Sequence, residues 1–239
     1  MPGRSCSWFG RISLRGLQTI VFSLAAFCIL PTLARASTIA YDNDTTLGDV
    51  GFLQNWHGVL GLDFNVNKAI TVTALGAYDQ GVTANLDGSD GTSGVTVGIF
   101  DRTTQTLVSP TALFTSTSPG VQINGDAFKA ESFTLLPGQY SVVSFNDKNY
   151  NEGFVSTVFN PTSTENSGGA ISFVGSGRFD TTAGLAYPTT VDTGPTNRYD
   201  AGTFAFVDTP EPSSYVLLIG AAIGGLVWRV RRRSPATAG

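Results

Sequence analysis

The sequence predicts an all-β protein, an antiparallel β-sandwich or jelly roll, with a membrane-directed segment at each end. Between residues 37 and 208, short segments alternate apolar and polar residues, and clusters of Gly, Asn, Asp, Pro and Ser separate them. The same stretch shows no convincing helical period. At both ends of the chain, by contrast, an uncharged apolar run lies beside arginines. Many short strands without helices are typical of two packed antiparallel sheets.

Each alternating segment predicts a strand. In chain order these segments are "GLDFNVN", "AITVTALGAYD", "GVTVGIFD", "ESFTLLPGQYSVVSFND", "GAISFVGSGRFD" and "AGTFAFVD". The fourth segment holds two strands, because Leu136-Pro137-Gly138-Gln139 has the composition of a tight turn. After that turn, Tyr140, Val142 and Ser144 are expected to share one face of a strand.

Two polar, glycine-rich segments, Thr83–Gly94 and Asn160–Gly169, lack apolar anchors, and we expect both to be surface loops. The first holds Asp87 and Asp90, which are weak candidates for a structural calcium site, because calcium prefers several oxygen ligands. The stretch "YDNDTTLGD" at residues 41–49 is similarly acidic. Neither has the spacing of an EF-hand, and Asp-Gly is an ordinary turn sequence, so turn formation is the favoured interpretation. No other cofactor is predicted.

Charge is distributed unevenly along the chain. Residues 37–208 hold seventeen acids and six bases, a net charge of −11, although the whole chain carries only −4. The remaining bases lie in the terminal segments. An acidic body without a basic stripe argues against a nucleic-acid partner.

The residues needed for most enzyme chemistries are scarce. Cys6 and Cys28 lie in the first thirty residues, and His57 is the only histidine. This excludes Cys–His catalysis and a multi-histidine zinc site in the body, and no G-x-S-x-G sequence accompanies His57. We expect His57 to pack at the edge of the sandwich. A pair of carboxylates for glycoside chemistry is possible in so acidic a chain, but the sequence selects no pair.

Aromatic residues near predicted loops suggest carbohydrate binding as an alternative function, since lectin-like sandwiches stack sugars on exposed rings. The candidates are Trp56, Tyr78, Tyr150 and Tyr187.

Residues 1–36 have the layout of a secretory signal peptide: basic residues, the apolar run Gly16–Leu30, and a small-residue cleavage site. Ala34 and Ala36 precede Ser37, the expected first residue after cleavage. The predicted partners at this stage are the secretion translocon and signal peptidase.

The C-terminal segment predicts a single transmembrane helix at about residues 213–230. Its apolar run reaches roughly eighteen residues, or about 27 Å of helix, which is just enough to cross the hydrocarbon core. Arg229, Arg231, Arg232 and Arg233 would stop transfer and mark the cytoplasmic side, with residues 234–239 as a short cytoplasmic tail. The acidic body would then lie outside.

Pro210, Glu211 and Pro212, the glycine-containing apolar run and the arginines follow one another in residues 209–233. This order resembles the PEP-CTERM sorting domain of exported proteins in Gram-negative bacteria. The resemblance implies that the Pro-Glu-Pro triplet is recognised by an exosortase, a membrane-embedded processing enzyme of species that make exopolysaccharide. It also implies a protein that is anchored in the inner membrane until it is processed and then reaches the cell surface or the medium.

The body, through "LGLDFNVNKAITVTALGAYD", "VGIFD" and "LLPGQYSVV", is similar to a jelly-roll-like module of unknown function in such exported proteins. We therefore expect a β-sandwich ectodomain at 37–208 in a non-enzymatic surface or matrix protein associated with extracellular polysaccharide. The alternatives are a lectin-like carbohydrate-binding module and a secreted glycoside-active enzyme.

Overall fold

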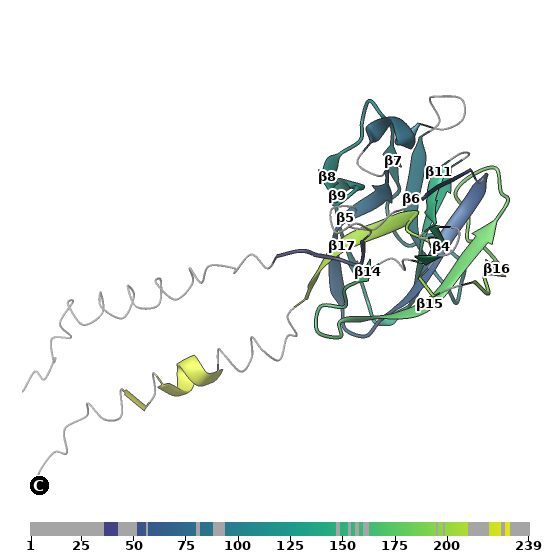
Figure 1. Cartoon of the computed structure of the whole chain (residues 1–239). Coiled ribbons are helices and arrows are strands. Elements are labelled where there is room, and N and C mark those ends of the chain that lie inside the picture. Colours follow the sequence, from purple (N-terminus) through teal and green to yellow (C-terminus); the bar gives the residue numbers. More distant parts are fainter. Residues whose placement is uncertain are drawn as a thin grey trace, which may run out of the picture. The chain divides into compact units, whose positions relative to one another are not determined.

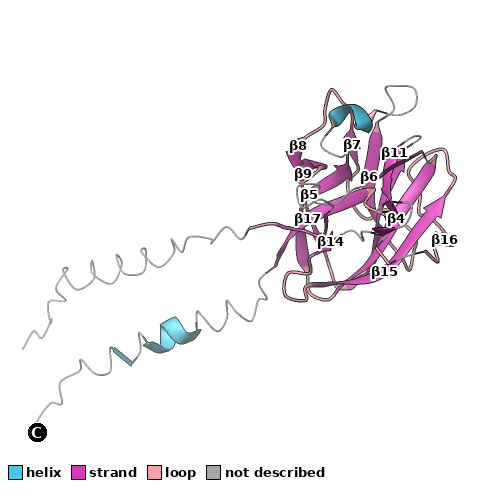
Figure 2. Ribbon diagram, viewed as in Figure 1, coloured by secondary structure: helices cyan, strands magenta, loops and turns pink. Residues whose placement is uncertain are grey.

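The computed structural model describes most of the body of the chain and a short part of its C-terminal segment. The described residues are 36–42, 52–55, 57–79, 82–87, 94–146, 149–152, 154–155, 158–159, 163–194, 196–197, 199–209, 220–225 and 228–229. Within the body these are strands and connecting loops, with one short helical turn at η2 (Thr83–Leu86) (Figure 2). The prediction of an all-β body is confirmed.

Two antiparallel sheets form the body (Figure 1). The five-stranded sheet has the order β1-β17-β5-β9-β8. Its strands are β1 (Thr38–Ile39), β17 (Gly202–Asp208), β5 (Ile70–Tyr78), β9 (Asp126–Leu135) and β8 (Val121–Ile123). The first and last strands of the body are therefore neighbours.

The six-stranded sheet has the order β16-β15-β4-β10-β6-β7. Its strands are β16 (Thr190–Val191), β15 (Ile171–Asp180), β4 (Gly58–Val66), β10 (Gly138–Asn146), β6 (Val95–Asp101) and β7 (Ala112–Phe114). Three two-stranded pairs complete the description. They join β11 (Asn149–Glu152) to β3 (Phe52–Asn55), β12 (Phe154–Val155) to β13 (Val158–Phe159), and β14 (Ser163–Thr164) to β2 (Tyr41–Asp42).

The core lies between the two sheets and follows the alternation in the sequence. In β4, Leu62, Phe64 and Val66 are buried in the main apolar cluster together with residues of the five-stranded sheet. The ring of Phe64 lies 4.7 Å from that of Phe204 in β17 and 5.8 Å from that of Tyr140 in β10, measured between centroids. Phe64 therefore joins both sheets near the centre of the core.

The tight turn predicted at Leu136-Pro137-Gly138-Gln139 is confirmed, since β9 ends at Leu135 and β10 begins at Gly138. The predicted loop Thr83–Gly94 needs a correction. Its first residues form η2, and Leu86 within it is fully buried in the main core. Leu86 is thus the apolar anchor that the sequence interpretation missed. Within the second predicted loop, Ser163 and Thr164 form β14, which pairs with β2.

The described residues of the C-terminal segment, 220–225 and 228–229, are helical and fall inside the predicted transmembrane span. In the described part of the chain, no helix has both the length and the hydrophobicity of a membrane span. The rest of the predicted span and residues 1–35 of the predicted signal peptide, which ends at residue 36, lie outside the described residues.

Candidate functional site

A carboxylate held by two arginines lies on the outer face of the six-stranded sheet. Because side chains alternate along β4, Asp63 points away from the core that Leu62 and Phe64 line. Arg178 comes from the neighbouring strand β15, and Arg102 follows the end of β6. Asp63 is nevertheless almost fully buried, with 1% of its surface exposed.

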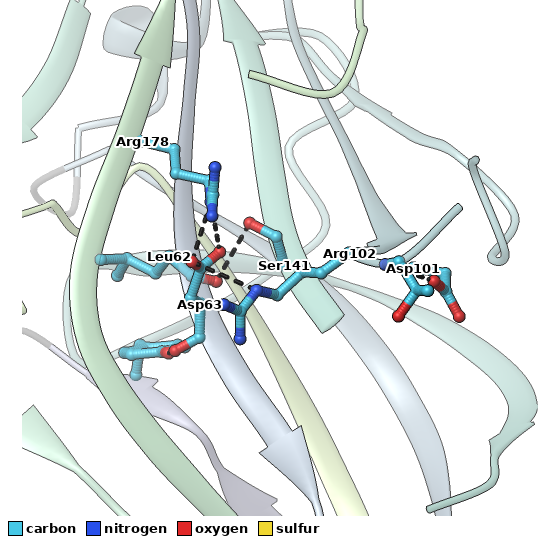
Figure 3. A network of polar contacts seen from close by, with 8 residues as sticks. Leu62, Asp63, Asp101, Arg102, Ser141 and Arg178 are labelled. Atoms are coloured by element: carbon cyan, nitrogen blue, oxygen red, sulfur yellow. Dashed lines mark hydrogen bonds and ion pairs between the residues drawn. The ribbon is translucent and has the colours of Figure 1, made fainter. Parts of the chain in front are cut away.

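The contacts within this group, which we call the Asp63 network, are short and charged (Figure 3). The Nε atom of Arg178 donates to both carboxylate oxygens of Asp63, at 2.9 and 2.8 Å. The Nε atom of Arg102 lies 3.3 Å from Oδ2 of Asp63. Beside them, the Ser141 hydroxyl donates to the Leu62 carbonyl at 3.3 Å. Two guanidinium groups against one carboxylate leave a local surplus of one positive charge.

A segment after β15, residues 181–189, covers this face of the sheet. Tyr187 in this covering segment packs against Phe100, and the Arg178 guanidinium carbon lies 5.2 Å from the centre of the Tyr187 ring, a cation–π contact. Burial raises the pKa of the Tyr187 phenol, so the ring stays neutral beside the arginines.

Glycines in the sheet let the covering segment approach closely. A Cβ atom at Gly61 would lie 2.9 Å from the Ser141 hydroxyl oxygen and 3.2 Å from a Pro188 side-chain carbon. One at Gly98 would lie 3.1 Å from a Leu185 methyl group. All three distances are shorter than ordinary van der Waals contact, so the glycines set how closely the segment packs on the sheet.

We therefore expect Gly61→Ala to lower the free energy of unfolding by about 1 to 3 kcal/mol, because the added methyl group overpacks the contact with Ser141 and Pro188. Gly184→Ala is the matched control, since no atom lies within 4 Å of the Cβ position there. Urea denaturation followed by circular dichroism would measure both. Equal effects of the two substitutions would contradict this account of Gly61.

A second charged group lies at one end of the five-stranded sheet, where β5 ends and β9 and β17 begin. Asp126 pairs with Tyr78, and Asp79 follows Tyr78 directly. Asp200 precedes β17, whose Gly202 pairs with Ala77. Asp79, Asp126 and Asp200 are all fully buried. Antiparallel pairing has therefore brought carboxylates from three strand ends together inside the protein.

Asp42, at the end of β2, belongs to the same neighbourhood, because its charge acts on both Asp126 and Asp200. We call Asp42, Asp79, Asp126 and Asp200 the acidic group. Burial, reinforced by the Asp42 carboxylate, raises the pKa of Asp200 from 3.8 to about 8. Burial and the other three carboxylates raise the pKa of Asp126 well above its ordinary value.

Amide side chains hold two members of the acidic group in place. The Gln122 Nε2 atom donates to Oδ2 of Asp79 at 2.6 Å, and the Asn124 Nδ2 atom donates to Oδ2 of Asp42 at 2.9 Å. In contrast, neither carboxylate oxygen of Asp126 or Asp200 has a hydrogen-bond partner within the described residues. In the same ranges, no set of three or more His, Cys, Asp or Glu side chains forms a ready-made metal centre.

Of the two acidic stretches that the sequence suggests for calcium, residues 41–49 contribute Asp42 to the acidic group, whereas Asp87 has a different contact. Oδ1 of Asp87 accepts a hydrogen bond from the Ser116 backbone N–H at 2.8 Å, which is the turn-stabilising role favoured by its sequence. Asp90 lies outside the described residues. His57 is exposed just before β4, and its packing at the edge of the sandwich stays a prediction.

Two of the four aromatic candidates for sugar stacking are unsuitable for that role. Tyr78 is 2% exposed and Tyr187 is 9% exposed, so neither presents an open ring face to solvent. Trp56 and the side chain of Tyr150 lie outside the described part of the structure. The prediction of exposed stacking platforms is therefore wrong for Tyr78 and Tyr187, because both rings fill space against the sheets.

Among the predicted processing residues, Ala36 and Ser37 are exposed and directly precede β1. The Ser37 hydroxyl lies 2.6 Å from that of Thr73 in β5. Arg229 is helical and exposed. The other predicted processing residues lie outside the described residues; they are Ala34, Pro210, Glu211, Pro212, Arg231, Arg232 and Arg233.

Comparison with known families shows that residues 208–233 match the PEP-CTERM protein-sorting motif. The match begins at Asp208, the last residue of β17, and includes the Pro-Glu-Pro triplet, the apolar run and the arginines. No curated protein matches the chain.

Proposed function

We propose, from the PEP-CTERM motif that makes this chain an exosortase-targeted exported protein, that its β-rich body is a non-enzymatic component of the cell surface or extracellular matrix. The signal peptide would open the export route and be removed before Ser37. The C-terminal segment would hold the body at the inner membrane until an exosortase cuts the chain near Pro210, Glu211 and Pro212. The body would then move to the cell surface or the medium.

The position of the motif supports this sequence of events. It begins where β17 ends, so only Thr209 separates the last strand of the body from the Pro-Glu-Pro triplet. Proline restricts its own backbone and that of the preceding residue to extended conformations, which favours a segment that a processing enzyme can bind. The triplet would therefore be presented between a folded body and the membrane.

Mass spectrometry of the C-terminus of the surface form tests the processing step. We expect the surface form to end before Arg229, and we expect replacement of Pro210, Glu211 and Pro212 by alanine to leave a full-length chain in the inner membrane. Glu165→Ala is the control, because Glu165 is exposed in the body and should not affect processing. An intact Arg233 on the surface form would refute the proposal.

A non-enzymatic role is supported by the contacts of three described acids outside the acidic group. Asp63 binds two arginines, Asp87 binds a backbone N–H, and Oδ2 of Asp180 accepts hydrogen bonds from the backbone and hydroxyl of Thr189 at 2.9 and 2.8 Å. These contacts stabilise neighbouring strands and the loops beside them. They give no particular support to the glycoside-active alternative.

The Asp63 network favours carbohydrate binding as a second candidate function. Arg102 and Arg178 retain 18% and 14% exposure of their side chains, and together they outweigh the single charge of Asp63. A positive site on an otherwise acidic body is suited to carboxylate or sulfate groups of an anionic polysaccharide. We infer that association with extracellular polysaccharide, where it occurs, uses this face rather than stacked aromatic rings.

Affinity electrophoresis through a gel that contains a polyuronate would measure this binding. We expect the polysaccharide to retard the wild-type protein and to retard the Arg102→Ala variant several-fold less. Lys68→Ala is the matched control, because Lys68 is an exposed cation outside the network. Equal retardation of both variants would show that the arginine pair is not the binding site.

A further inference from the structure

The acidic group combines buried negative charge with missing partners. Asp126 and Asp200 are fully buried, and all four of their carboxylate oxygens lack a hydrogen-bond partner within the described residues. The charges that raise the pKa of these two groups are all carboxylates. A buried carboxylate without a donor or a cation is costly, so this arrangement requires either bound protons or a bound positive ion.

The Tyr78 hydroxyl is an independent indication of a missing ligand. Tyr78 is 2% exposed, and its hydroxyl has no hydrogen-bond partner in the described part of the chain. Its pKa is raised by burial and by the charges of Asp200, Asp126 and Asp79, so the hydroxyl lies near the same carboxylates. A phenol oxygen and four carboxylate oxygens therefore lie without partners in one buried neighbourhood.

The acids of this group come from the ends of different strands, so strand pairing forms the site, and it is not a single acidic loop. Asp126 pairs with Tyr78, and the Asp79 N–H donates to the Gly125 carbonyl at 3.1 Å, so β5 and β9 hold these residues side by side. Asp200 is two residues before Gly202, which pairs with Ala77. The acids are far apart in sequence, and only the sheet brings them together.

We propose that the acidic group binds one divalent cation of the calcium type, with Asp126 and Asp200 as its principal ligands and Asp42 and Asp79 as supporting ligands. The donor set consists of oxygen atoms, which calcium prefers, and calcium accepts six to eight of them in flexible geometry. Gln122 and Asn124 each donate to one oxygen of a supporting ligand, and such contacts orient ligands in metal sites. No three described acidic side chains form a ready-made metal centre, so the carboxylates would have to move closer to one another when the ion binds.

Calcium fits this site better than magnesium does. Magnesium requires near-ideal octahedral geometry and retains several waters, whereas calcium accepts the varied geometry that carboxylates from separate strand ends can supply. Two positive charges among four carboxylates also remove much of the mutual repulsion. The site is distinct from the loop at Asp87, whose carboxylate is engaged with Ser116.

Calcium titration of the purified full-length chain, followed by thermal melting, tests the proposal. We expect calcium at a hundred times its Kd to raise Tm by roughly 5 to 10 °C, because the ion binds only the folded state. Asp200→Asn and Asp126→Asn should each abolish most of that rise, and Asp87→Asn, the matched control, should keep it. Magnesium at the same concentration should have a much smaller effect.

Terbium luminescence provides a second measurement that does not depend on stability. Terbium replaces calcium at oxygen sites, and Tyr78 lies close enough to the acidic group to sensitise it. We expect tyrosine-excited terbium emission that calcium displaces and that falls at least several-fold in Asp200→Asn. The proposal is overturned if calcium leaves Tm and terbium emission unchanged, if magnesium acts equally well, or if Asp87→Asn removes the response as Asp200→Asn does.

Discussion

In the absence of divalent cations, the free energy of unfolding should fall as the pH rises from about 4 to about 8. Asp200 has its pKa raised from 3.8 to about 8 in the folded protein, so the folded chain binds this proton more tightly than the unfolded chain does. The stability from that proton is fully present below pH 3.8 and is lost as the pH passes through about 8. The loss is on the order of 5 kcal/mol, and Asp126 acts in the same direction.

Urea denaturation at a series of pH values, with a chelator present, measures this effect. Asp200→Asn should flatten the profile and should be more stable than the wild type at pH 8, because an amide cannot ionise. Asp87→Asn should leave the profile unchanged. Added calcium should also flatten it, since the ion replaces the protons. A wild-type stability that rises steadily from pH 4 to pH 8 would show that the acidic group is not buried in this form.

Asp63→Ala should lower the free energy of unfolding by about 3 kcal/mol, because it leaves two largely buried guanidinium groups without their carboxylate. The Arg178 contact is the stronger of the two, since both carboxylate oxygens accept from its Nε atom. The covering segment should loosen as well, because Arg178 also packs on Tyr187. Chemical denaturation would give the size of the loss, and proteolysis within residues 181–189 would show the loosening.

Two comparisons separate the charge effect from simple loss of packing. The triple variant Asp63→Leu, Arg102→Met, Arg178→Met should recover a large part of the stability, because apolar side chains of similar size replace the whole buried group of ions at little cost. Glu165→Ala removes an exposed carboxylate and should change stability by less than about 0.5 kcal/mol. If Asp63→Ala were as mild as Glu165→Ala, the network would contribute little to the fold.

Local patterns were sufficient to predict the long strands. The alternation in "GLDFNVN" predicts that Leu62, Phe64 and Val66 face the core, and they do. The tight turn before Tyr140 was also predictable, because proline and glycine impose their own backbone preferences. In both cases a residue's conformation depends on its immediate neighbours, which is the information that a single sequence contains.

The charged sites were not predictable, because they depend on pairing between distant residues. Asp63 occupies an alternate polar position that is typical of a solvent-facing side chain, yet it is buried beside Arg102 and Arg178. Asp126 and Asp200 each look like ordinary turn residues, and the register of β5 with β9 and β17 brings them together. The sequence suggested calcium ligands only where acids lie close together along the chain, at Asp87 and Asp90 and at residues 41–49. Asp42 in the second stretch belongs to the acidic group, but the other three members come from distant strand ends.

The pairing of β1 with β17 has a consequence for the timing of folding during export. Ser37 and Phe206, which are 169 positions apart, come together at the edge of the five-stranded sheet. A chain that crosses a membrane from its N-terminus delivers β17 last, yet β17 lies between β1 and β5. We therefore expect β5 to lack one of its two neighbours until translocation has reached residue 208. The five-stranded sheet would then be completed as the sorting motif reaches the membrane. The folded body and the motif that directs its release would therefore become available at the same time.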